Sequence, residues 1–375
     1  MRLVIAGGGT GGHLFPGIAI AEALLEMDPT SEVLFIGTAR GIEVRAVPKA
    51  GFALELIEVK GLKGASLAER AKTMAMLPAA GLQSRRILQR FGADAVIGVG
   101  GYASGPALVA ARLMGLPTAV CEQNSVPGVT NRILARLVDR VYVTFAASLS
   151  SFPAGKTELV GNPVRKSFRD AARRAVDGAS SSVVAGRIFT FGGSQGARPL
   201  NEAVPKALGL LQARGRTVSA MHQAGKDAVA GVEAGYAAAG VDADVTPFID
   251  DMVSAYRSAE LVVCRAGATS CAEVTALGVP AILVPFPQAA DDHQTMNAKD
   301  LVDQGAAVLL PQSSLTPEHL ADVIEGLLTD HGALARLREG ARQAGRLDAA
   351  AVIAAAAAAG FPPAASTAAT REQTA

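Results

Sequence analysis

The stretch Arg2–Gly17, RLVIAGGGTGGHLFPG, decides the fold, because an apolar strand pattern runs directly into a glycine-rich turn. Five of the six residues from Gly7 to Gly12 are glycine, and His13 and Pro16 follow them. Glycine loses more backbone freedom on folding than any other residue, so this cluster is costly. We therefore expect a very tight turn, or a ligand that approaches the backbone closely. A strand, a glycine turn and a helix in this order are typical of a Rossmann-like α/β domain.

Short apolar runs alternate with helical patterns, such as Pro16–Met27 and Ser104–Met114, along the rest of the chain. This alternation predicts the α/β class, with parallel, doubly wound sheets. The strands expected in the first half are Leu3–Ala6, Val33–Ile36, Leu54–Ile57, Ala95–Val99, Thr118–Cys121 and Val141–Thr144. Those expected in the second half are Ile188–Phe191, Val218–His222, Val245–Pro247, Leu261–Cys264, Ala281–Val284 and Ala307–Leu310.

The second half restarts the pattern with its own glycine turn, FGGSQGAR, after the Ser/Gly/Ala-rich stretch 175–186. We therefore expect two Rossmann-like domains, residues 1–163 and 164–345, that face a cleft. The alanine-rich segment 346–360 predicts a C-terminal helix that packs back on the first domain. The Pro/Ala/Thr-rich tail 361–375 is expected to be disordered.

The composition argues against several classes of protein, namely nucleic-acid-binding, disulfide-bonded and membrane-spanning proteins. The net charge of +1 over 375 residues gives no global signal for nucleic acid. Three cysteines without CxxC spacing suit a reducing cytoplasm, with the thiols as small buried groups. The uncharged runs 3–21 and 349–370 are interrupted by glycine or proline, or are only weakly apolar. We predict neither a signal peptide nor a transmembrane helix there.

The first glycine turn also fits the GxGxxG dinucleotide pattern through Gly7, Gly9 and Gly12. The acidic ribose partner expected at the end of the second strand is missing, because Gly37 and Thr38 stand there. The structural alternative is a tight turn without a ligand. A histidine at the mouth of the helix, on a backbone bare of side chains, argues against that alternative.

Further polar segments follow predicted strands. The glycine turns 98–106 and 192–196 come directly after strands, and the second offers N–H groups and a hydroxyl to an anion. Glu273 either stabilises the first turn of a helix or clamps a ribose diol. The segment DDHQTMNA, residues 291–298, begins another helix, and its polar groups are expected in the same crevice.

Eight segments together resemble one family, the MurG-type N-acetylglucosaminyltransferases of peptidoglycan synthesis. In chain order they read GGGTGGH, GVGGYASGP, EQNSVPG, VGNPVR, FGGSQGA, FIDDM, CRAGATSCAE and DDHQTMNA. The resemblance spans about Arg2 to Gln312 and implies the GT-B glycosyltransferase architecture. It also implies an inverting transfer of N-acetylglucosamine from UDP-N-acetylglucosamine to the muramoyl C4 hydroxyl of lipid I, undecaprenyl-pyrophosphoryl-muramoyl-pentapeptide. The products would be lipid II and UDP.

The resemblance also implies the substrate-binding residues, which would contact the donor from both domains. In the first domain they are Thr10, Gly11, Gly12, Asn124 and Arg165. In the second domain they are Ser194, Ile249, Ala268, Thr269, Ser270, Cys271, Ala272, Glu273 and Gln294. One departure from the family pattern is the polar run Thr269–Cys271, where a more apolar segment is expected.

The chemistry needs a base for the acceptor hydroxyl and stabilisation of the leaving diphosphate. His13 is our first candidate for the base, because a neutral imidazole can take a proton near neutral pH. Glu122 is the second candidate, and His13 would then only bind a ligand. No cofactor and no metal are expected, since GT-B enzymes generally use helix N-termini and backbone N–H groups. The DxD-like Asp242–Asp244 is interpreted as a solvated loop.

The stretch 59–90 mixes basic and apolar side chains. Its basic members are Lys60, Lys63, Arg70, Lys72, Arg85 and Arg86, and its apolar members are Leu67, Met74, Met76, Leu77 and Leu82. This mixture suits peripheral docking on the cytoplasmic face of the plasma membrane, and an ordinary amphipathic helix is the alternative. Other cell-wall synthesis proteins are expected partners, and nucleic acid is not. The rival function classes are an NAD- or flavin-dependent oxidoreductase and a non-catalytic nucleotide-sugar-binding module.

Overall fold

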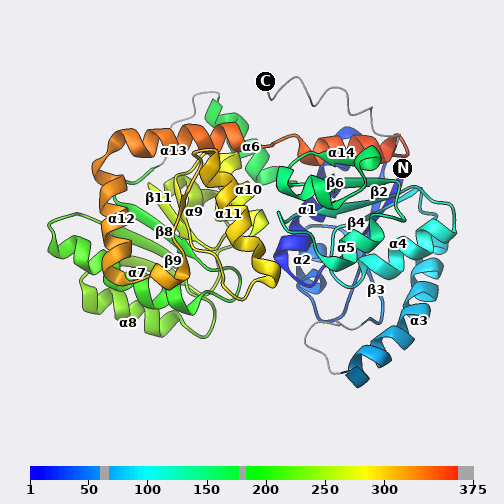
Figure 1. Cartoon of the computed structure of the whole chain (residues 1–375), viewed down its shortest axis with the longest axis horizontal. Coiled ribbons are helices and arrows are strands. Elements are labelled where there is room, and N and C mark those ends of the chain that lie inside the picture. Colours follow the sequence, from blue (N-terminus) through cyan, green and yellow to red (C-terminus); the bar gives the residue numbers. More distant parts are fainter. Residues whose placement is uncertain (60–66, 177–182, 362–375) are drawn as a thin grey trace. The chain divides into compact units, whose positions relative to one another are not determined.

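A computed structural model of the chain describes residues 1–59, 67–176 and 183–361. The chain forms two compact units, one made of Met1–Lys166 with the segment from Leu347 onward, the other of Ser167–Arg346 (Figure 1). The first division falls three residues beyond the boundary expected from the sequence. Residues 175–176 and 183–186, the described ends of the Ser/Gly/Ala-rich stretch, belong to the second unit. Residues 177–182 and 362–375 of the sequence predictions lie outside the described residues.

The first unit contains a parallel sheet in the order β3-β2-β1-β4-β5-β6-β7. Its strands are β1 Arg2–Ala6, β2 Glu32–Gly37, β3 Ala53–Leu56, β4 Ala95–Gly98, β5 Thr118–Glu122, β6 Arg140–Val143 and β7 Thr157–Leu159. Its helices are α1 Gly11–Met27, α2 Glu43–Lys49, α3 Leu67–Phe91, α4 Ser104–Leu113, α5 Val129–Leu134 and α14 Ala349–Ala358. The prediction missed β7, which is short and only half-buried, so it carries no apolar signal.

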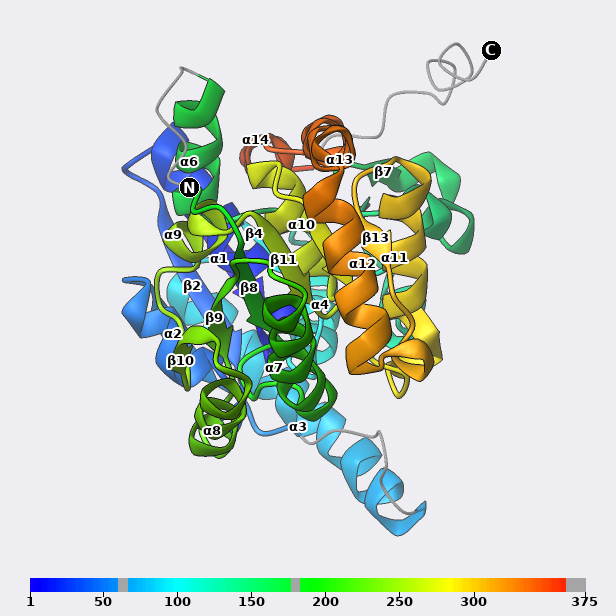
Figure 2. The same cartoon turned by 90° about the vertical axis from the view of Figure 1, so that its left-hand side faces the viewer.

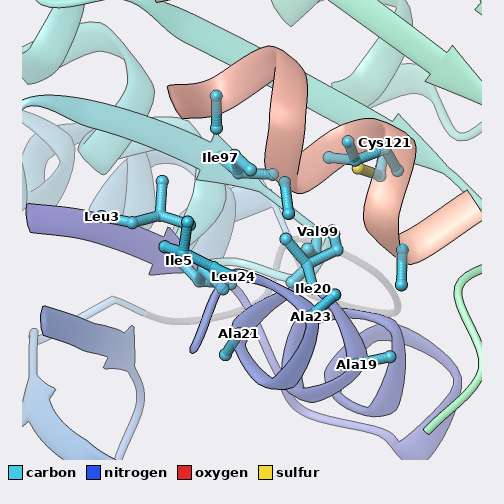
Figure 3. Close-up of a cluster of buried hydrophobic side chains, with 14 of the residues drawn as sticks. Leu3, Ile5, Ala19, Ile20, Ala21, Ala23, Leu24, Ile97, Val99 and Cys121 are labelled. Atoms are coloured by element: carbon cyan, nitrogen blue, oxygen red, sulfur yellow. The ribbon is translucent and has the colours of Figure 1, made fainter. Parts of the chain in front are cut away.

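Helices cover both faces of this sheet, as its fully buried central strand requires. Leu3 and Ile5 point to the face covered by α1, where Ile20 and Leu24 pack on them (Figure 3). The alanine-rich α14 packs against α1 on that same face, and its small side chains allow a close approach. The alternate residues of β1 belong to the opposite core, under α3, α4 and α5.

The second unit contains a parallel sheet in the order β10-β9-β8-β11-β12-β13. Its strands are β8 Arg187–Phe191, β9 Ser219–Gln223, β10 Asp242–Thr246, β11 Leu261–Cys264, β12 Ala281–Leu283 and β13 Val308–Leu309. The helices are α6 Lys166–Val176, α7 Arg198–Ala213, α8 Val229–Ala239, α9 Met252–Ser258, α10 Ala268–Leu277, α11 His293–Asp303, α12 Pro317–Thr329 and α13 His331–Ala344.

Helices also cover both faces of the second sheet (Figure 2). One face of the sheet packs against α7, α8 and α12. On the opposite face, Tyr256 of α9 makes edge-on contacts with Phe189 and Phe191 of β8. Because neighbouring residues of a strand point to opposite faces, Ile188 joins the core under α7 instead. The predicted α/β class and two doubly wound parallel sheets are thus confirmed.

Two local predictions were wrong. The first helix begins at Gly11 rather than at Pro16, because Thr10 takes the extended N-cap conformation and the helix continues through the proline. The segment Asp242–Asp244 is not a loop but the start of the edge strand β10. Both aspartates are exposed, since the period of two along a strand puts them on the same face.

Candidate active site

The first half of the site lies where β1 and β4 end side by side. The order of the strands in the first sheet reverses between β1 and β4, and ligands of doubly wound folds bind at such a point. The glycine turns that follow the two strands interlock, with the Gly8 N–H donating to the Gly100 carbonyl at 3.2 Å. The hydroxyl of Ser104 bridges the strands, because it contacts the Ala6 carbonyl at 2.7 Å and the Gly100 N–H at 3.0 Å. Two segments about ninety residues apart therefore form one rigid turn region.

His13 sits in the first turn of α1, directly over the second glycine turn. A Cβ atom on Gly100 would come within 2.6 Å of the His13 ring, so only glycine lets the imidazole lie there. The ring nitrogen Nδ1 lies 3.3 Å from the hydroxyl oxygen of Thr10, the N-cap residue of α1. When Nδ1 carries the proton and donates to Thr10, Nε2 keeps a lone pair that can accept a proton.

A buried carboxylate accepts a hydrogen bond from the first glycine turn, and the sequence analysis did not predict it. Glu43, the first residue of α2, is 1% exposed. Its Oε2 accepts the Gly9 N–H at 2.7 Å, and its Oε1 accepts both the N–H and the hydroxyl of Thr38 at 3.0 Å. A Cβ on Gly8 would lie 2.5 Å from the Glu43 carboxyl carbon, which explains a glycine at that position. The ends of β1 and β2 are thus tied to one side chain.

Glu122, the second candidate for the base, is fully engaged in structural hydrogen bonds. It ends β5, is 3% exposed, and accepts the N–H groups of Asn124 and Gly128 at 3.0 and 3.1 Å. The side-chain amide of Asn131 adds a bond of 2.9 Å. Burial raises the pKa of Glu122, although these hydrogen bonds oppose the shift. The carboxylate therefore organises the loop that presents Asn124, and it offers little to an incoming hydroxyl.

Arg165 is anchored on the helix that carries His13. Its guanidinium carbon lies 4.5 Å from the centre of the Phe15 ring of α1. The next residue, Lys166, donates its backbone N–H to Glu22 at 2.6 Å and pairs with Glu26 at 3.2 Å. Val160 also belongs to the core cluster that contains the buried residues of α1, so the segment VGNPVR docks along this helix.

The second half of the site lies where β8 and β11 end side by side, again at the point where the strand order reverses. The turn Gly192–Gly196 follows β8, and Ser194 is exposed on it. The helix α10 follows β11 and begins at Ala268, with Gly267 as an N-cap that has no side chain. The N-cap residue itself therefore supplies no side chain to the N–H groups of the first turn. Cys271 is buried, and burial raises its thiol pKa to about 12, so only its backbone can serve a ligand.

Glu273 lies in the second turn of α10, so the alternative in which it stabilises the first turn is wrong. Its side chain is 5% exposed, and Oε2 accepts the hydroxyl of Tyr256 at 3.2 Å. Tyr256 itself is fixed in the aromatic cluster with Phe168 and Phe189. The hydroxyl of Tyr256 thus binds one oxygen of this buried carboxylate.

The two remaining predicted contacts are also held by hydrogen bonds. The Ile249 N–H donates to the Gln223 side chain at 2.8 Å, so its carbonyl is the group left for a ligand. The Gln294 carbonyl oxygen accepts the Phe286 N–H at 3.0 Å, which leaves the amide NH₂ as a donor. Asn297 was expected in the crevice, but it is fully buried and donates to the Ala266 carbonyl at 3.2 Å.

Arg265 at the end of β11 is a structural cation. Its guanidinium donates to the carbonyls of Val284 and Pro285 at 3.1 and 2.9 Å, and to Gln312 at 2.6 Å. Burial lowers the pKa of this arginine. The side chain fastens the ends of β11 and β12 together, so it supports the start of α10.

Two further properties bear on function. Within residues 1–59, 67–176 and 183–361, no three or more His, Cys, Asp or Glu side chains are placed to hold a metal ion. In the same ranges, no helix combines the length and the apolar character needed to cross a bilayer. All three cysteines are buried and free, as predicted.

Comparison with known proteins agrees with this geometry. Residues 3–143 match the glycosyltransferase family 28 N-terminal domain, and residues 187–353 match its C-terminal domain. The curated UDP-N-acetylglucosamine–N-acetylmuramyl-(pentapeptide) pyrophosphoryl-undecaprenol N-acetylglucosamine transferase of Syntrophus aciditrophicus (strain SB) is 47% identical, over 93% of this chain and 96% of that protein. The transferase of the same name from Anaeromyxobacter sp. (strain K) is 49% identical, over 92% and 89%. The crystal structure of Acinetobacter baumannii MurG is 34% identical, with a TM-score of 0.74, over 94% of this chain and 98% of that one.

The fold and the two matched domains define a glycosyltransferase of the GT-B type. Within that class, the chain belongs to the family of UDP-N-acetylglucosamine–N-acetylmuramyl-(pentapeptide) pyrophosphoryl-undecaprenol N-acetylglucosamine transferases, the MurG family.

Proposed function

We propose that this protein transfers N-acetylglucosamine from UDP-N-acetylglucosamine to the muramoyl C4 hydroxyl of lipid I, with inversion at the anomeric carbon, in peptidoglycan synthesis. The observation that carries the proposal is the position of the family's segments. Four of them, GGGTGGH, GVGGYASGP, FGGSQGA and CRAGATSCAE, follow the strands between which the strand order of each sheet reverses, and such points are the ligand sites of these folds.

The oxidoreductase alternative lacks its ribose-binding acid. The acid nearest the end of β2 is Glu43, and its two oxygens already accept groups of Gly9 and Thr38. A ribose diol would have to displace those bonds from a buried side chain. The glycosyltransferase assignment needs no such rearrangement, since the first turn then faces a sugar hydroxyl.

The proposed mechanism divides the work between the two units. In the first unit, Nε2 of His13 takes the proton of the attacking hydroxyl, while Nδ1 is held by Thr10. In the second unit, the turn with Ser194 and the uncapped start of α10 receive the leaving diphosphate. Glu273 accepts the ribose hydroxyls, the Ile249 carbonyl faces uracil, and Gln294 donates to the sugar. Glu122 is a weaker candidate for the base, because its oxygens already accept several hydrogen bonds.

One assay tests the reaction against both alternatives. The protein is incubated with UDP-N-acetylglucosamine and a lipid I analogue, and UDP and the disaccharide product are quantified by chromatography. We expect both products in equal amounts. A protein that binds the donor without forming disaccharide would be a binding module, and a reaction that requires a nicotinamide cofactor would refute the proposal.

The lipid acceptor makes a membrane contact necessary, and we place it on the first unit. Part of the predicted basic and apolar stretch lies outside the described residues, namely residues 60–66 and the side chains of residues 67–75. Of the remainder, Leu82, Arg85 and Arg86 are exposed on α3, whereas Ile87 and Leu88 belong to the core. The two interpretations of this helix therefore apply to different residues of it.

The neighbouring helices extend the exposed surface. We name as the docking surface the exposed apolar residues Leu82, Val109, Leu113, Val129, Ile133 and Leu137, with the exposed arginines Arg85, Arg86, Arg112, Arg132 and Arg136. Leu113 is 83% exposed, and Val129 and Ile133 are 58% exposed, which is a high value for apolar side chains. The helices α3, α4 and α5 that carry most of them pack side by side. Apolar side chains among arginines suit an anionic lipid surface at the cytoplasmic face.

A vesicle experiment tests this surface. The double variant Leu113→Glu, Ile133→Glu should lose sedimentation with vesicles that contain anionic phospholipid. Val44→Glu is the matched control, because Val44 is 41% exposed on α2, which packs on a different part of the sheet. Equal binding by the two variants would contradict the assignment.

A further inference from the structure

Gln223 connects two segments of the proposed donor site that are far apart in the sequence. It is the last residue of β9 and is 3% exposed. Its amide NH₂ donates to the Gly193 carbonyl at 2.8 Å, and its amide oxygen accepts the Ile249 N–H at 2.8 Å. A carbonyl on one side and an N–H on the other fix which end of the amide points where. One side chain therefore joins the turn that carries Ser194 to the corner that carries Ile249.

The end of β9 supports the glycine turn in a second way. The chain after Gln223, at Ala224 and Gly225, packs directly against the backbone of Gln195 and Gly196. The amide of Asn201 in α7 donates to the Ala224 carbonyl at 2.9 Å, and its oxygen lies 3.1 Å from Nε2 of His222. The glycine turn after β8 thus rests on the residues that follow β9.

His222 makes this support rigid. It is fully buried, and its Nδ1 lies 2.9 Å from the hydroxyl of Tyr236 in α8. Burial lowers the pKa of His222 to about 4, so the imidazole is neutral at physiological pH. His222 and Gln223 lie on opposite faces of the strand. His222 links β9 to α7 and α8, and Gln223 links it to the loops proposed to bind the donor.

We propose that Gln223 is a positioning residue that couples recognition of the base to recognition of the diphosphate. It touches neither ligand group itself. It fixes the distance between the Ile249 carbonyl and the Ser194 turn, so that one nucleotide diphosphate can satisfy both. The proposal rests on the donor site described under Proposed function, and it adds the residue that sets the geometry of that site.

Two substitutions separate positioning from general stability. Gln223→Met keeps the volume and removes both hydrogen bonds. Gln223→Glu keeps an acceptor for the Ile249 N–H but, when ionised, turns a second oxygen toward the Gly193 carbonyl. When protonated, the same carboxyl group can again donate to Gly193 and accept from Ile249. The matched control is Gln212→Glu, because the Gln212 amide also donates to a carbonyl, that of Gly240, at the other end of α7.

The measurements are calorimetric binding of UDP and uridine, donor KM and kcat, and far-ultraviolet circular dichroism to verify folding. Gln223→Met should weaken UDP binding about tenfold, while uridine binding weakens less and kcat at saturating donor changes less than about threefold. Relative to the wild type at the same pH, Gln223→Glu should regain UDP affinity as pH falls, and Gln223→Met should not. Gln212→Glu should bind UDP as the wild type does.

The binding results distinguish a failure of the Gln223 inference from a failure of the donor-site assignment. Normal UDP binding by both Gln223 variants, when Glu273→Gln weakens it, would overturn the inference alone. Normal binding by the Gln223 variants and by Glu273→Gln would overturn the donor-site assignment as well. A fall in kcat with unchanged donor KM, or the absence of a pH-dependent recovery in Gln223→Glu, would also overturn the positioning role.

Discussion

Replacing Glu43 by glutamine should loosen the first glycine turn without unfolding the protein. The carboxylate accepts three hydrogen bonds, from the Gly9 N–H and from the N–H and hydroxyl of Thr38. A glutamine has one oxygen, so it can keep the two bonds to Thr38 or the one to Gly9. In the better of these arrangements, an NH₂ group faces the Gly9 N–H, and two donors meet.

The expected loss in the free energy of unfolding follows from the number of hydrogen bonds that the substitution removes. A hydrogen bond to a charged group contributes about 1.5–3 kcal/mol, and a buried donor left without an acceptor costs about 1–3 kcal/mol. Because both figures describe the same lost bond, we expect the free energy of unfolding to fall by about 2–3 kcal/mol. A domain with a stability of about 5–15 kcal/mol remains folded after such a loss. Displacement of Gly9 should also shift the start of α1 and lower kcat, since a misplacement of about 1 Å can cost about a hundredfold.

Urea denaturation followed by circular dichroism, together with steady-state kinetics, checks both numbers. Glu202→Gln is the matched control, because Glu202 is exposed and pairs only with Arg198 on the same helix turn among the contacts of the described residues. That variant should behave as the wild type in both assays. If Glu43→Gln matches Glu202→Gln in stability and in kcat, the carboxylate does not hold the turn and the reasoning fails.

Four other outcomes are expected. His13→Ala should lower kcat by about 10²–10⁴ with little change in donor KM, and the fall of wild-type kcat toward low pH should vanish in it; near-normal kcat would make His13 only a ligand contact. Glu273→Ala should raise the KM for UDP-N-acetylglucosamine about ten- to a hundredfold and reduce discrimination against deoxyribose nucleotides, whereas an unchanged KM would remove the ribose role. Activity should survive EDTA without added metal, and loss restored by magnesium would refute the metal-free mechanism. Because burial lowers the pKa of His222 to about 4, the unfolded chain binds its proton first as pH falls; stability should drop by about 3 kcal/mol between about pH 6.5 and 4, and His222→Asn should flatten that part of the curve.

The sequence predicted the fold well because its signals are local. Buried parallel strands such as Leu3–Ala6 are continuous apolar runs, and each glycine turn follows one directly. The errors arose where a local pattern has two interpretations. Asp242–Asp244 resembles a loop because aspartate is rare in strands, yet an exposed edge strand accepts it. Glu273 was placed one helical turn too early, because glycine at the N-cap gives no side-chain signal for the start of α10.

The residues that hold the site could not be predicted in the same way. Glu43 meets Gly9 across thirty-four positions, and Gln223 meets Gly193 across thirty. No spacing rule links such pairs, because their approach depends on the completed sheet. One signal was available for Gln223, namely a polar residue at the carboxyl end of a buried parallel strand, where ligand sites form. The motifs proposed for catalysis and binding are glycine-rich and easy to find, whereas the side chains that shape them look ordinary in the sequence.

The two units hold their loops with groups of different charge, and this difference bears on which substrate each receives. Carboxylates support the first unit, since Glu43 lies behind the first glycine turn and Glu122 behind the loop of Asn124. The neutral amide of Gln223 and the guanidinium of Arg265 support the second unit. An anion placed against a carboxylate-backed turn is repelled, while a neutral hydroxyl is not. This difference supports the proposal that the second unit binds the diphosphate of the donor and that the first turn faces the sugar hydroxyl that His13 would deprotonate. Removal of the negative charge behind the first turn, or addition of one behind the Ser194 turn, should accordingly weaken or strengthen the binding of one substrate and leave that of the other.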